Sequence, residues 1–225
     1  MKDEIRVAIC VPGHSWHNAT GFALCEMIAH FHEAKIKNPR KVKTFAVEGS
    51  ILQDVRNLLI KHALAWKPTH LLLVDADMKI PPDTLVKLLR HNEAVVGLNY
   101  VQRHVGALPN TFKKGYGKDG RVATLSTSTG LVEVDHMGLG CVLIDARVFD
   151  YIQAPAFEFH TVKTYDDEGN VTDWHTKGED VSFFEKVREA GIKVWMDHDV
   201  SKAVGHCGDF EFRHELYEAH LNGHQ

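Results

Sequence analysis

The sequence has no long apolar run and only four cysteines, and both absences limit what the protein can be. No apolar segment approaches the roughly 20 residues that a membrane-spanning helix needs. The N-terminal stretch MKDEIRVAIC is charged and lacks the long apolar centre of a signal peptide. The cysteines are scattered without a C-x-x-C pair, which disfavours a zinc cluster and a disulfide framework. We therefore expect a cytoplasmic protein with buried free thiols.

The sequence also lacks several motifs that identify common sites. No H-E-x-x-H or comparable zinc pattern organises the sixteen histidines, most of which we expect at the surface or in loops. No G-x-G-x-x-G follows the first strand-like segment, as a Rossmann dehydrogenase would require. That segment ends in Pro-Gly-His instead of the acidic pair of a receiver-type signalling module. The net charge of −4 gives no general reason to expect a polyanionic partner.

The 225 residues suit one compact domain, and strand-like and helical segments alternate as far as residue 102. The expected strands are 5–12, 41–49, 69–77 and 94–101; the expected helices are about 18–35, one after Ser50 and one after Pro82. Ser50 and Gln53 have the spacing of a capping box, which would begin the second helix. Alternating strands and helices favour a parallel sheet with helices on both faces.

The pattern changes after about residue 103, where a loop rich in glycine and lysine begins. Beyond it we expect strands within 121–126 and 130–145, a hairpin around 166–170, a helix over 179–190, a strand over 193–197 and a last helix near 209–221. This part is typical of a mixed α+β layer. The chain as a whole is expected to form an α/β fold with a central mixed sheet flanked by helices. We expect one domain of residues 1–225, with functional halves 1–102 and 103–225.

The segment THLLLVDADMKIPPD, residues 69–83, carries a D-x-D motif at the end of a buried strand. Open α/β sheets bind ligands at the carboxyl ends of their strands. Asp75 and Asp77 alternate along the backbone, so both carboxylates can point to one side, where they repel unless a cation or donor lies between them. Carboxylates suit Mg²⁺ or Mn²⁺, which typically bridge them to substrate phosphates. The alternative is structural: the acids cap the next helix or bind loop amides.

A second acidic pair and a late histidine add to this motif. Glu179 and Asp180 open a helix, where the macrodipole favours negative charge even without a function. That explanation does not account for the glycine before the pair, or for His206 in a Gly-His-Cys-Gly turn. Imidazole is compatible with Mn²⁺, so His206 is a candidate to complete the shell of an ion.

In this order the motifs resemble those of the GT-A glycosyltransferases, in particular the small family 2-like enzymes of phages and bacteria. The shared features are a strand ending in D-x-D, a G-x-G stretch at residues 138–140, Glu-Asp opening a helix, and a late histidine. The resemblance spans about residues 5–208. It implies an enzyme using Mn²⁺ or Mg²⁺ that moves a sugar from a nucleotide-diphosphate sugar, with UDP-sugars favoured, to an acceptor hydroxyl. A phage-encoded enzyme would work in the host cytoplasm.

The resemblance also implies a donor site. The turn after the first strand would lie against the nucleotide base, with an Arg-Asn pair beside the nucleotide. Asp75 would bind ribose or a metal-bound water, and two glycines would let a loop approach the sugar. The residues so assigned are Val11, Pro12, Gly13, His14, Arg56, Asn57, Asp75, Ala76, Gly138 and Gly140.

The resemblance also assigns residues to metal binding and catalysis. The implied metal ligands are Asp75, Asp77 and His206. Asp180 would be the general base for the acceptor hydroxyl, and in-line attack would then invert the anomeric configuration. Glu179 would hold the donor sugar or the acceptor hydroxyl. Trp174 and His175 are candidates for a wall of the acceptor site.

The acceptor and the activity both have alternatives. The acceptor is either a hydroxymethylated base in phage DNA, whose phosphates the basic stretch 103–121 would track, or a surface glycan. A non-catalytic nucleotide-sugar-binding protein on the same fold is one alternative, although it has little need of a base. A nucleotidyltransferase like the sugar-nucleotide pyrophosphorylases is another, although VPGHSWHN supplies no arginine or lysine for a triphosphate.

Overall fold

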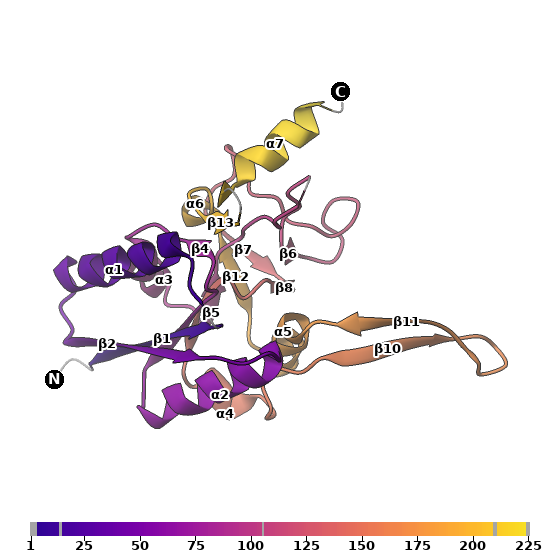
Figure 1. Cartoon of the computed structure of the whole chain (residues 1–225), viewed down its shortest axis with the longest axis horizontal. Coiled ribbons are helices and arrows are strands. Elements are labelled where there is room, and N and C mark those ends of the chain that lie inside the picture. Colours follow the sequence, from indigo (N-terminus) through magenta and orange to yellow (C-terminus); the bar gives the residue numbers. More distant parts are fainter. Residues whose placement is uncertain (1–3, 14, 105, 209–210, 224–225) are drawn as a thin grey trace.

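The computed structural model describes residues 4–13, 15–104, 106–208 and 211–223, built around one seven-stranded sheet (Figure 1). The strands follow the order β2-β1-β3-β9-β5-β12-β7. They are β1 (Ile5–Pro12), β2 (Arg40–Val47), β3 (His70–Val74), β5 (Val95–Gly97), β7 (Leu131–Val134), β9 (Cys141–Asp145) and β12 (Val194–Asp197). β1 is parallel to β2 and β3, and β5 is parallel to β12. β9 is antiparallel to β3 and β5, and β7 to β12. The predicted central mixed sheet is confirmed.

Helices cover both faces of the sheet because its central strands are apolar on both sides. On β1, Val7, Ile9 and Val11 belong to one buried core. Ala8 and Cys10 belong to the other, as the two-residue period of a strand requires. The helices of the first core are α1 (Asn18–Glu33), α3 (Thr84–His91) and the short α6 (His198–Ser201). Those of the second are α2 (Leu52–Ala65), α5 (Glu179–Glu189) and the short α4 (Val148–Tyr151).

Small sheets extend the molecule beyond this layer. β4 (Met78–Lys79), β13 (Gly205–Cys207) and β14 (Glu211–Phe212) form one of them, and β6 (Thr111–Phe112) pairs with β8 (His136–Met137). β10 (His160–Tyr165) and β11 (Val171–Lys177) form a hairpin that projects away from the sheet (Figure 1). The last helix is α7 (His214–Gly223). Pairing of β13 with β4 sets His206 opposite Met78, the residue after Asp77.

β9 from the second half of the chain lies between β3 and β5. Two local expectations are wrong. No capping box begins α2: its N-cap is Ile51, and Gln53 instead accepts a hydrogen bond from the N–H of Phe159 (2.7 Å). Residues 121–126 form no strand, because Val122 O and Thr124 Oγ1 accept hydrogen bonds from the buried Asn99 side chain.

None of the helices in the described ranges has both the length and the apolar character needed to cross a membrane. All four cysteines are free thiols. Cys10, Cys141 and Cys207 are buried, as expected, whereas Cys25 on α1 is exposed.

Candidate active site

The turns that follow β1 and β3 lie against each other at the carboxyl ends of these parallel strands. The N–H of His17 donates to the carbonyl oxygen of Ala76 (2.8 Å). Gly13 has a φ of +120°, and a Cβ there would lie 3.6 Å from the Cβ of Ala76. Beside the turns is a cavity of about 560 Å³, lined by Ser15, Trp16, His17, Asn18, Ala76, Asp77, Arg103, Cys207 and Gly208. The cavity therefore lies where open α/β sheets bind ligands.

Arg56 joins the D-x-D segment to the acidic pair of α5. Its buried guanidinium places Nη2 2.9 Å from Asp75 Oδ1 and Nε 3.2 Å from Glu179 Oε1. Burial alone would lower the pKa of Arg56, but the charges of Asp75 and Glu179 raise that pKa above its ordinary value. Burial raises the pKa of Glu179, and the positive charge of Arg56 acts in the opposite direction. One cation thus holds carboxylates from two distant parts of the sequence.

Asp77 faces the late histidine. His206 Nε2 is 3.5 Å from Asp77 Oδ2, and His206 Nδ1 is 2.9 Å from the carbonyl oxygen of Val101. Arg103 Nη1 is 3.1 Å from the same Asp77 oxygen. Burial would raise the pKa of Asp77, but His206 and then Arg103 outweigh it and lower that pKa. Asp77 is therefore held as a carboxylate.

The three predicted metal ligands do not form one set. Asp75 is engaged by Arg56, and the described residues include no group of three or more His, Cys, Asp and Glu arranged to hold a metal ion. Asp77 and His206 remain as a pair. Asp77 Oδ1 is buried and has no hydrogen-bond partner in the described part of the chain. Such a pair fits an Mg²⁺ or Mn²⁺ ion that takes its other ligands from water and substrate phosphates.

Gly138 and Gly140 let the segment between β8 and β9 close over Tyr100. A Cβ on Gly138 would overlap the Tyr100 hydroxyl oxygen, and one on Gly140 would lie 2.6 Å from the ring. The Tyr100 and His206 rings meet edge to face, with centroids 5.1 Å apart. The close approach that these glycines permit is therefore to an aromatic ring that packs against His206.

Asp180 occupies the first turn of α5, after the N-cap Gly178. Its Oδ1 accepts a hydrogen bond from the N–H of Val181 (2.8 Å), and a Cβ on Gly178 would lie 2.6 Å from the same oxygen. Burial raises the pKa of Tyr100, and the charges of Asp75 and Asp180 add to that shift, so both carboxylates lie near this ring. Tyr100 is thus a common neighbour of the D-x-D segment, the acidic pair and His206.

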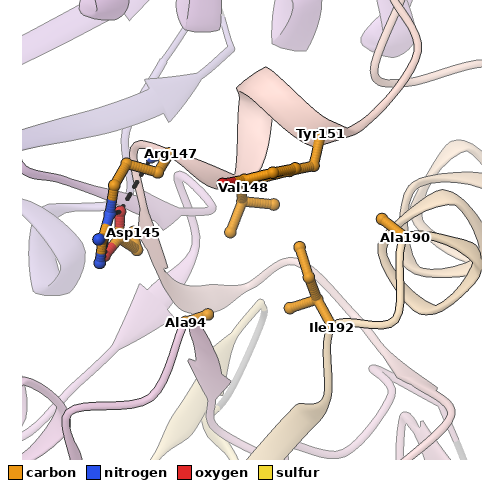
Figure 2. A pocket seen from close by; sticks show the side chains of 7 residues that line it. All are labelled: Ala94, Asp145, Arg147, Val148, Tyr151, Ala190 and Ile192. Carbon is orange, nitrogen blue, oxygen red and sulfur yellow. Dashed lines mark hydrogen bonds and ion pairs between the residues drawn. The ribbon is translucent and has the colours of Figure 1, made fainter.

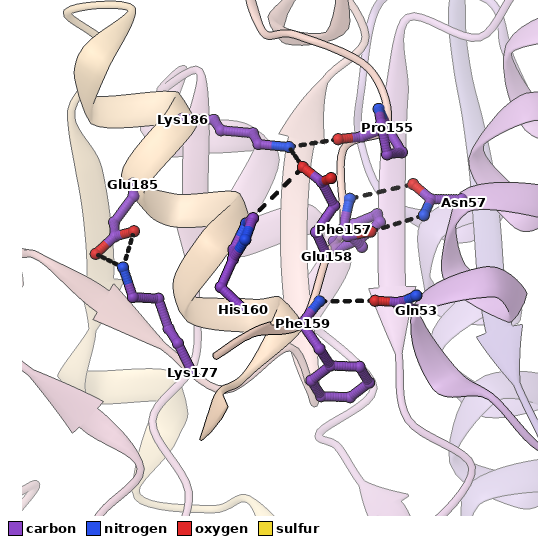
Figure 3. A network of polar contacts seen from close by, with 10 residues as sticks. All are labelled: Gln53, Asn57, Pro155, Phe157, Glu158, Phe159, His160, Lys177, Glu185 and Lys186. Atoms are coloured by element: carbon purple, nitrogen blue, oxygen red, sulfur yellow. Dashed lines mark hydrogen bonds and ion pairs between the residues drawn. The ribbon is translucent and has the colours of Figure 1, made fainter. Parts of the chain in front are cut away.

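Asn57 is not part of this group. Its amide nitrogen donates to the carbonyl oxygen of Phe157 (2.8 Å), and its amide oxygen accepts from the Phe157 N–H (3.1 Å; Figure 3). Arg56 and Asn57 are neighbours on α2 but serve different parts of the molecule. Arg56 faces the carboxylates, and Asn57 holds the segment that leads into β10.

Other predicted residues also lie apart from the cavity. Trp174 and His175 are on β11 of the projecting hairpin, where Trp174 is 65% exposed. Val11 and Pro12 are buried in β1, and the Val11 side chain belongs to the core. His14 lies outside the described residues.

A second hollow, of about 250 Å³, lies where β9 ends and β5 begins (Figure 2). It is lined by Ala94, Asp145, Arg147, Val148, Tyr151, Ala190 and Ile192. Arg147 Nη2 is 2.6 Å from Asp145 Oδ2, and this guanidinium lowers the pKa of Asp145. Asp145 pairs with His70 at the start of β3, so this hollow lies at the edge of the sheet opposite the carboxyl ends of β1 and β3 and is a poorer candidate for an active site.

No protein-family model and no curated protein matches the sequence. Among solved structures, the chain is similar to A197 from STIV, with 16% identity, a TM-score of 0.54, and 91% of this chain and 87% of that chain covered. Its similarity to the catalytic domain of Drosophila β1,4-galactosyltransferase 7, in complex with xylobiose, has 14% identity, a TM-score of 0.48 and coverage of 86% and 65%. At this identity the likeness to A197 shows a shared fold alone, and the weaker similarity adds nothing to it.

Two residues of the site are missing from the sequence-based assignment. Tyr100 is the second-last residue of the apolar stretch 94–101, where nothing distinguishes it from a core aromatic. Arg103 belongs to a basic stretch that is most simply explained as a solvated surface. Only the fold brings Arg103 to Asp77 and Tyr100 to His206.

Proposed function

We propose that the protein is a glycosyltransferase that moves a sugar from a nucleotide-diphosphate sugar, a UDP-sugar above all, to an acceptor hydroxyl. One observation carries the proposal: the cavity at the carboxyl ends of β1 and β3 has Asp77 in its wall, and His206 Nε2 lies 3.5 Å from that carboxylate. Arg56 joins the neighbouring Asp75 to the acidic pair at the start of α5. Arg56 thereby connects the proposed nucleotide site to the helix start that carries Asp180, the candidate base.

Asp77 and His206 are the residues that would hold Mn²⁺ or Mg²⁺ beside the donor diphosphate. Asp77 Oδ1 has no hydrogen-bond partner among the described residues, and Arg103 is a half-exposed cation that can turn from Asp77 toward a phosphate. When bound, the ion neutralises charge that develops on the diphosphate leaving group. The turns at Gly13 and Ala76 lie beside this cavity and suit the nucleotide.

Asp180 is the proposed general base. The acceptor oxygen attacks the anomeric carbon, the bond from that carbon to the diphosphate oxygen breaks with its electron pair, and the hydroxyl proton passes to an Asp180 carboxylate oxygen. The N-terminus of α5 stabilises negative charge at this position. Glu179 is buried against Arg56 and is better placed to orient the site than to accept the proton. Direct attack of this kind inverts the anomeric configuration.

Asp180→Asn keeps the shape of the side chain and removes its basicity. We expect sugar transfer to fall by about 10²- to 10⁴-fold while donor binding is unchanged. The exposed Asp167→Asn in the hairpin turn is the matched control and should transfer normally. The anomeric proton coupling of the product, measured by NMR, should show inversion. Retention of configuration, or full activity in Asp180→Asn, would contradict the assigned base.

The salt dependence of acceptor binding distinguishes the two candidate acceptors. Lys114 and Lys118 are exposed in the basic stretch 103–121. If the acceptor is DNA carrying a hydroxymethylated base, binding should weaken steeply with salt and on replacing these lysines by alanine. Binding of a neutral glycan should respond to neither change. A nucleotidyltransferase like the sugar-nucleotide pyrophosphorylases would instead join a nucleoside triphosphate to a sugar 1-phosphate and release pyrophosphate, whereas a glycosyltransferase releases a nucleoside diphosphate.

A further inference from the structure

The β10–β11 hairpin projects from the molecule without a strand beside it (Figure 1). Within the described ranges its two strands pair only with each other, and nearly all their residues are exposed. Tyr165, Val171 and Trp174 are large exposed apolar residues of these strands. A lone two-stranded hairpin is marginally stable in water, and a free strand edge offers unpaired backbone groups to another strand. Both features indicate that a partner covers this element.

The hairpin is presented in a fixed direction, because its root is held by two helices (Figure 3). Gln53 and Asn57 of α2 bind the backbone of Phe159 and Phe157. Lys186 of α5 contacts the carboxylate of Glu158. An arm anchored in this way loses little freedom when it binds, which favours association.

The backbone N–H of Trp174 on β11 is bonded only locally, so an added strand can replace its partner. The N–H of Trp174 donates to the carboxylate of Asp173, its own neighbour, at 2.8 Å. A bond to that side chain directs the N–H away from β10 and onto the free edge. Trp174 therefore carries the backbone groups with which an added strand would pair.

The sequence of β11 is self-complementary about Trp174. Residues 172–176 read Thr-Asp-Trp-His-Thr, which is nearly the same in both directions. If two copies of β11 run antiparallel about Trp174, each Asp173 faces His175 of the partner subunit. Each Thr172 then faces Thr176 of the partner subunit. An imidazole N–H can donate to the carboxylate that faces it, and threonine pairs are favourable cross-strand neighbours.

The outer edge of β10 has no such match. Lys163 lies near the middle of this strand, so self-pairing there would bring like charges together, which is unfavourable. The charge pattern therefore selects β11 and a second copy of the same strand.

We propose that two copies of this chain associate through antiparallel pairing of β11 with its own copy, about a two-fold axis at Trp174. The two hairpins then form one four-stranded sheet. The Trp174 residues of the two subunits exchange N–H···O=C bonds on the axis, and the face that carries Trp174 and Tyr165 becomes continuous. The interface is isologous, as expected of a two-fold dimer. This inference does not depend on the proposed enzymatic activity.

A charge-exchange series measured by analytical ultracentrifugation of the full chain tests the pairing. Wild type should show a reversible monomer–dimer equilibrium. His175→Asp sets carboxylates opposite each other twice per dimer, and Asp173→His removes both attractions; each change should raise the dissociation constant at least about tenfold. The double variant Asp173→His with His175→Asp again sets an aspartate opposite a histidine and should return to within about threefold of wild type. His62→Asp, the same substitution at an exposed site on α2, is the control and should have no effect.

Cross-linking tests the position of the axis. In a background of Cys25→Ser, Trp174→Cys sets two thiols on the axis, with Cα atoms about 5.5 Å apart in a hydrogen-bonded pair, which suits a disulfide. Thr172→Cys should not cross-link, because Thr172 faces Thr176 of the partner subunit.

A chain that stays monomeric at every concentration would overturn the proposal. So would a dimer that neither responds to the two single exchanges nor cross-links through Trp174→Cys. A monomer whose tryptophan fluorescence changes with added oligosaccharide, and not in Trp174→Phe, would assign the strand to the acceptor instead.

Discussion

At the scale of single residues, the candidate site depends on Arg56. This buried cation lies between Asp75 and Glu179, and its Nη1 has no hydrogen-bond partner among the described residues. A buried guanidinium needs carboxylates to be tolerated, and buried carboxylates need the guanidinium. The arrangement fixes where α5 begins relative to β3, and therefore where Asp180 lies relative to Asp77.

Arg56→Met keeps the bulk of the side chain and removes its charge. Breaking a buried ion pair from one side costs about 3–5 kcal/mol. Because Asp75 is partly solvated, we expect the free energy of unfolding to fall by about 3 kcal/mol at neutral pH, measured by urea denaturation. Arg147→Met removes the exposed partner of Asp145 and is the matched control, with a change below about 1 kcal/mol.

The loss caused by Arg56→Met should shrink at acid pH. Burial already raises the pKa of Glu179, and removing Arg56 raises that pKa further. A carboxyl whose pKa is raised by folding contributes stability below its unfolded pKa, and this contribution is lost as pH rises through its folded pKa. The deficit of the variant should therefore be smaller near about pH 5 than near about pH 8. Equal deficits at the two values would show that Glu179 is not the buried partner.

At the scale of elements, α2 connects the site to the hairpin. Arg56 faces the carboxylates, while Asn57 binds both backbone groups of Phe157, and Gln53 binds the N–H of Phe159. The side chains of α2 therefore bind the backbone of alternate residues before β10, Phe157 and Phe159, as a neighbouring β-strand would. The orientation of the hairpin follows from these contacts.

Asn57→Ala removes both hydrogen bonds to Phe157. We expect a loss of about 1–2 kcal/mol in unfolding free energy, because the Phe157 backbone groups lose their partner. Amide hydrogen exchange should speed up at Phe157 and through β10, while β1 and β3 keep their protection. Gln53→Ala removes a single bond and should give a smaller effect at Phe159. Unchanged exchange at Phe157 would mean that the root is held by other contacts.

Local patterns in the sequence predict the elements better than their neighbours in space. β1, α1, β3, α5 and β12 follow from apolar runs and helical spacing, and the turn of the β10–β11 hairpin follows from Asp166–Asn170. The insertion of β9 between β3 and β5 was missed, since pairing between distant strands leaves no local pattern. The capping-box prediction is wrong because the Gln53 side chain accepts a hydrogen bond from the N–H of Phe159 instead. These two residues are more than a hundred positions apart in the sequence.

The same limit applies to the site. The sequence predicted Asp75, Asp77 and His206 as site residues. In the structure His206 lies 3.5 Å from Asp77, whereas Asp75 forms an ion pair with Arg56. Tyr100 was missed because its role depends on His206 and the two glycines that close over it. The roles assigned to these residues in donor binding, metal binding and catalysis stay predictions.

At the scale of the whole molecule, the two halves of the chain build one sheet. β1, β2, β3 and β5 come from the first half, and β7, β9 and β12 from the second. β13 also returns from the second half to pair beside the D-x-D segment. This return brings His206, more than a hundred residues away in the sequence, to Asp77. We propose that the two residues hold a metal ion beside a nucleotide-diphosphate sugar.

The most direct test is the thermal stability of the protein with a panel of UDP-sugars, in Mn²⁺ or in EDTA. A donor at about 100 times its dissociation constant should stabilise wild type by roughly 2.7 kcal/mol in Mn²⁺. The shift should vanish in EDTA and in Asp77→Ala, and persist in Asp83→Ala, which removes a more exposed aspartate from the same segment. A shift that ignores the metal or survives Asp77→Ala would contradict the metal site, and no shift with any nucleotide sugar would contradict the proposed function.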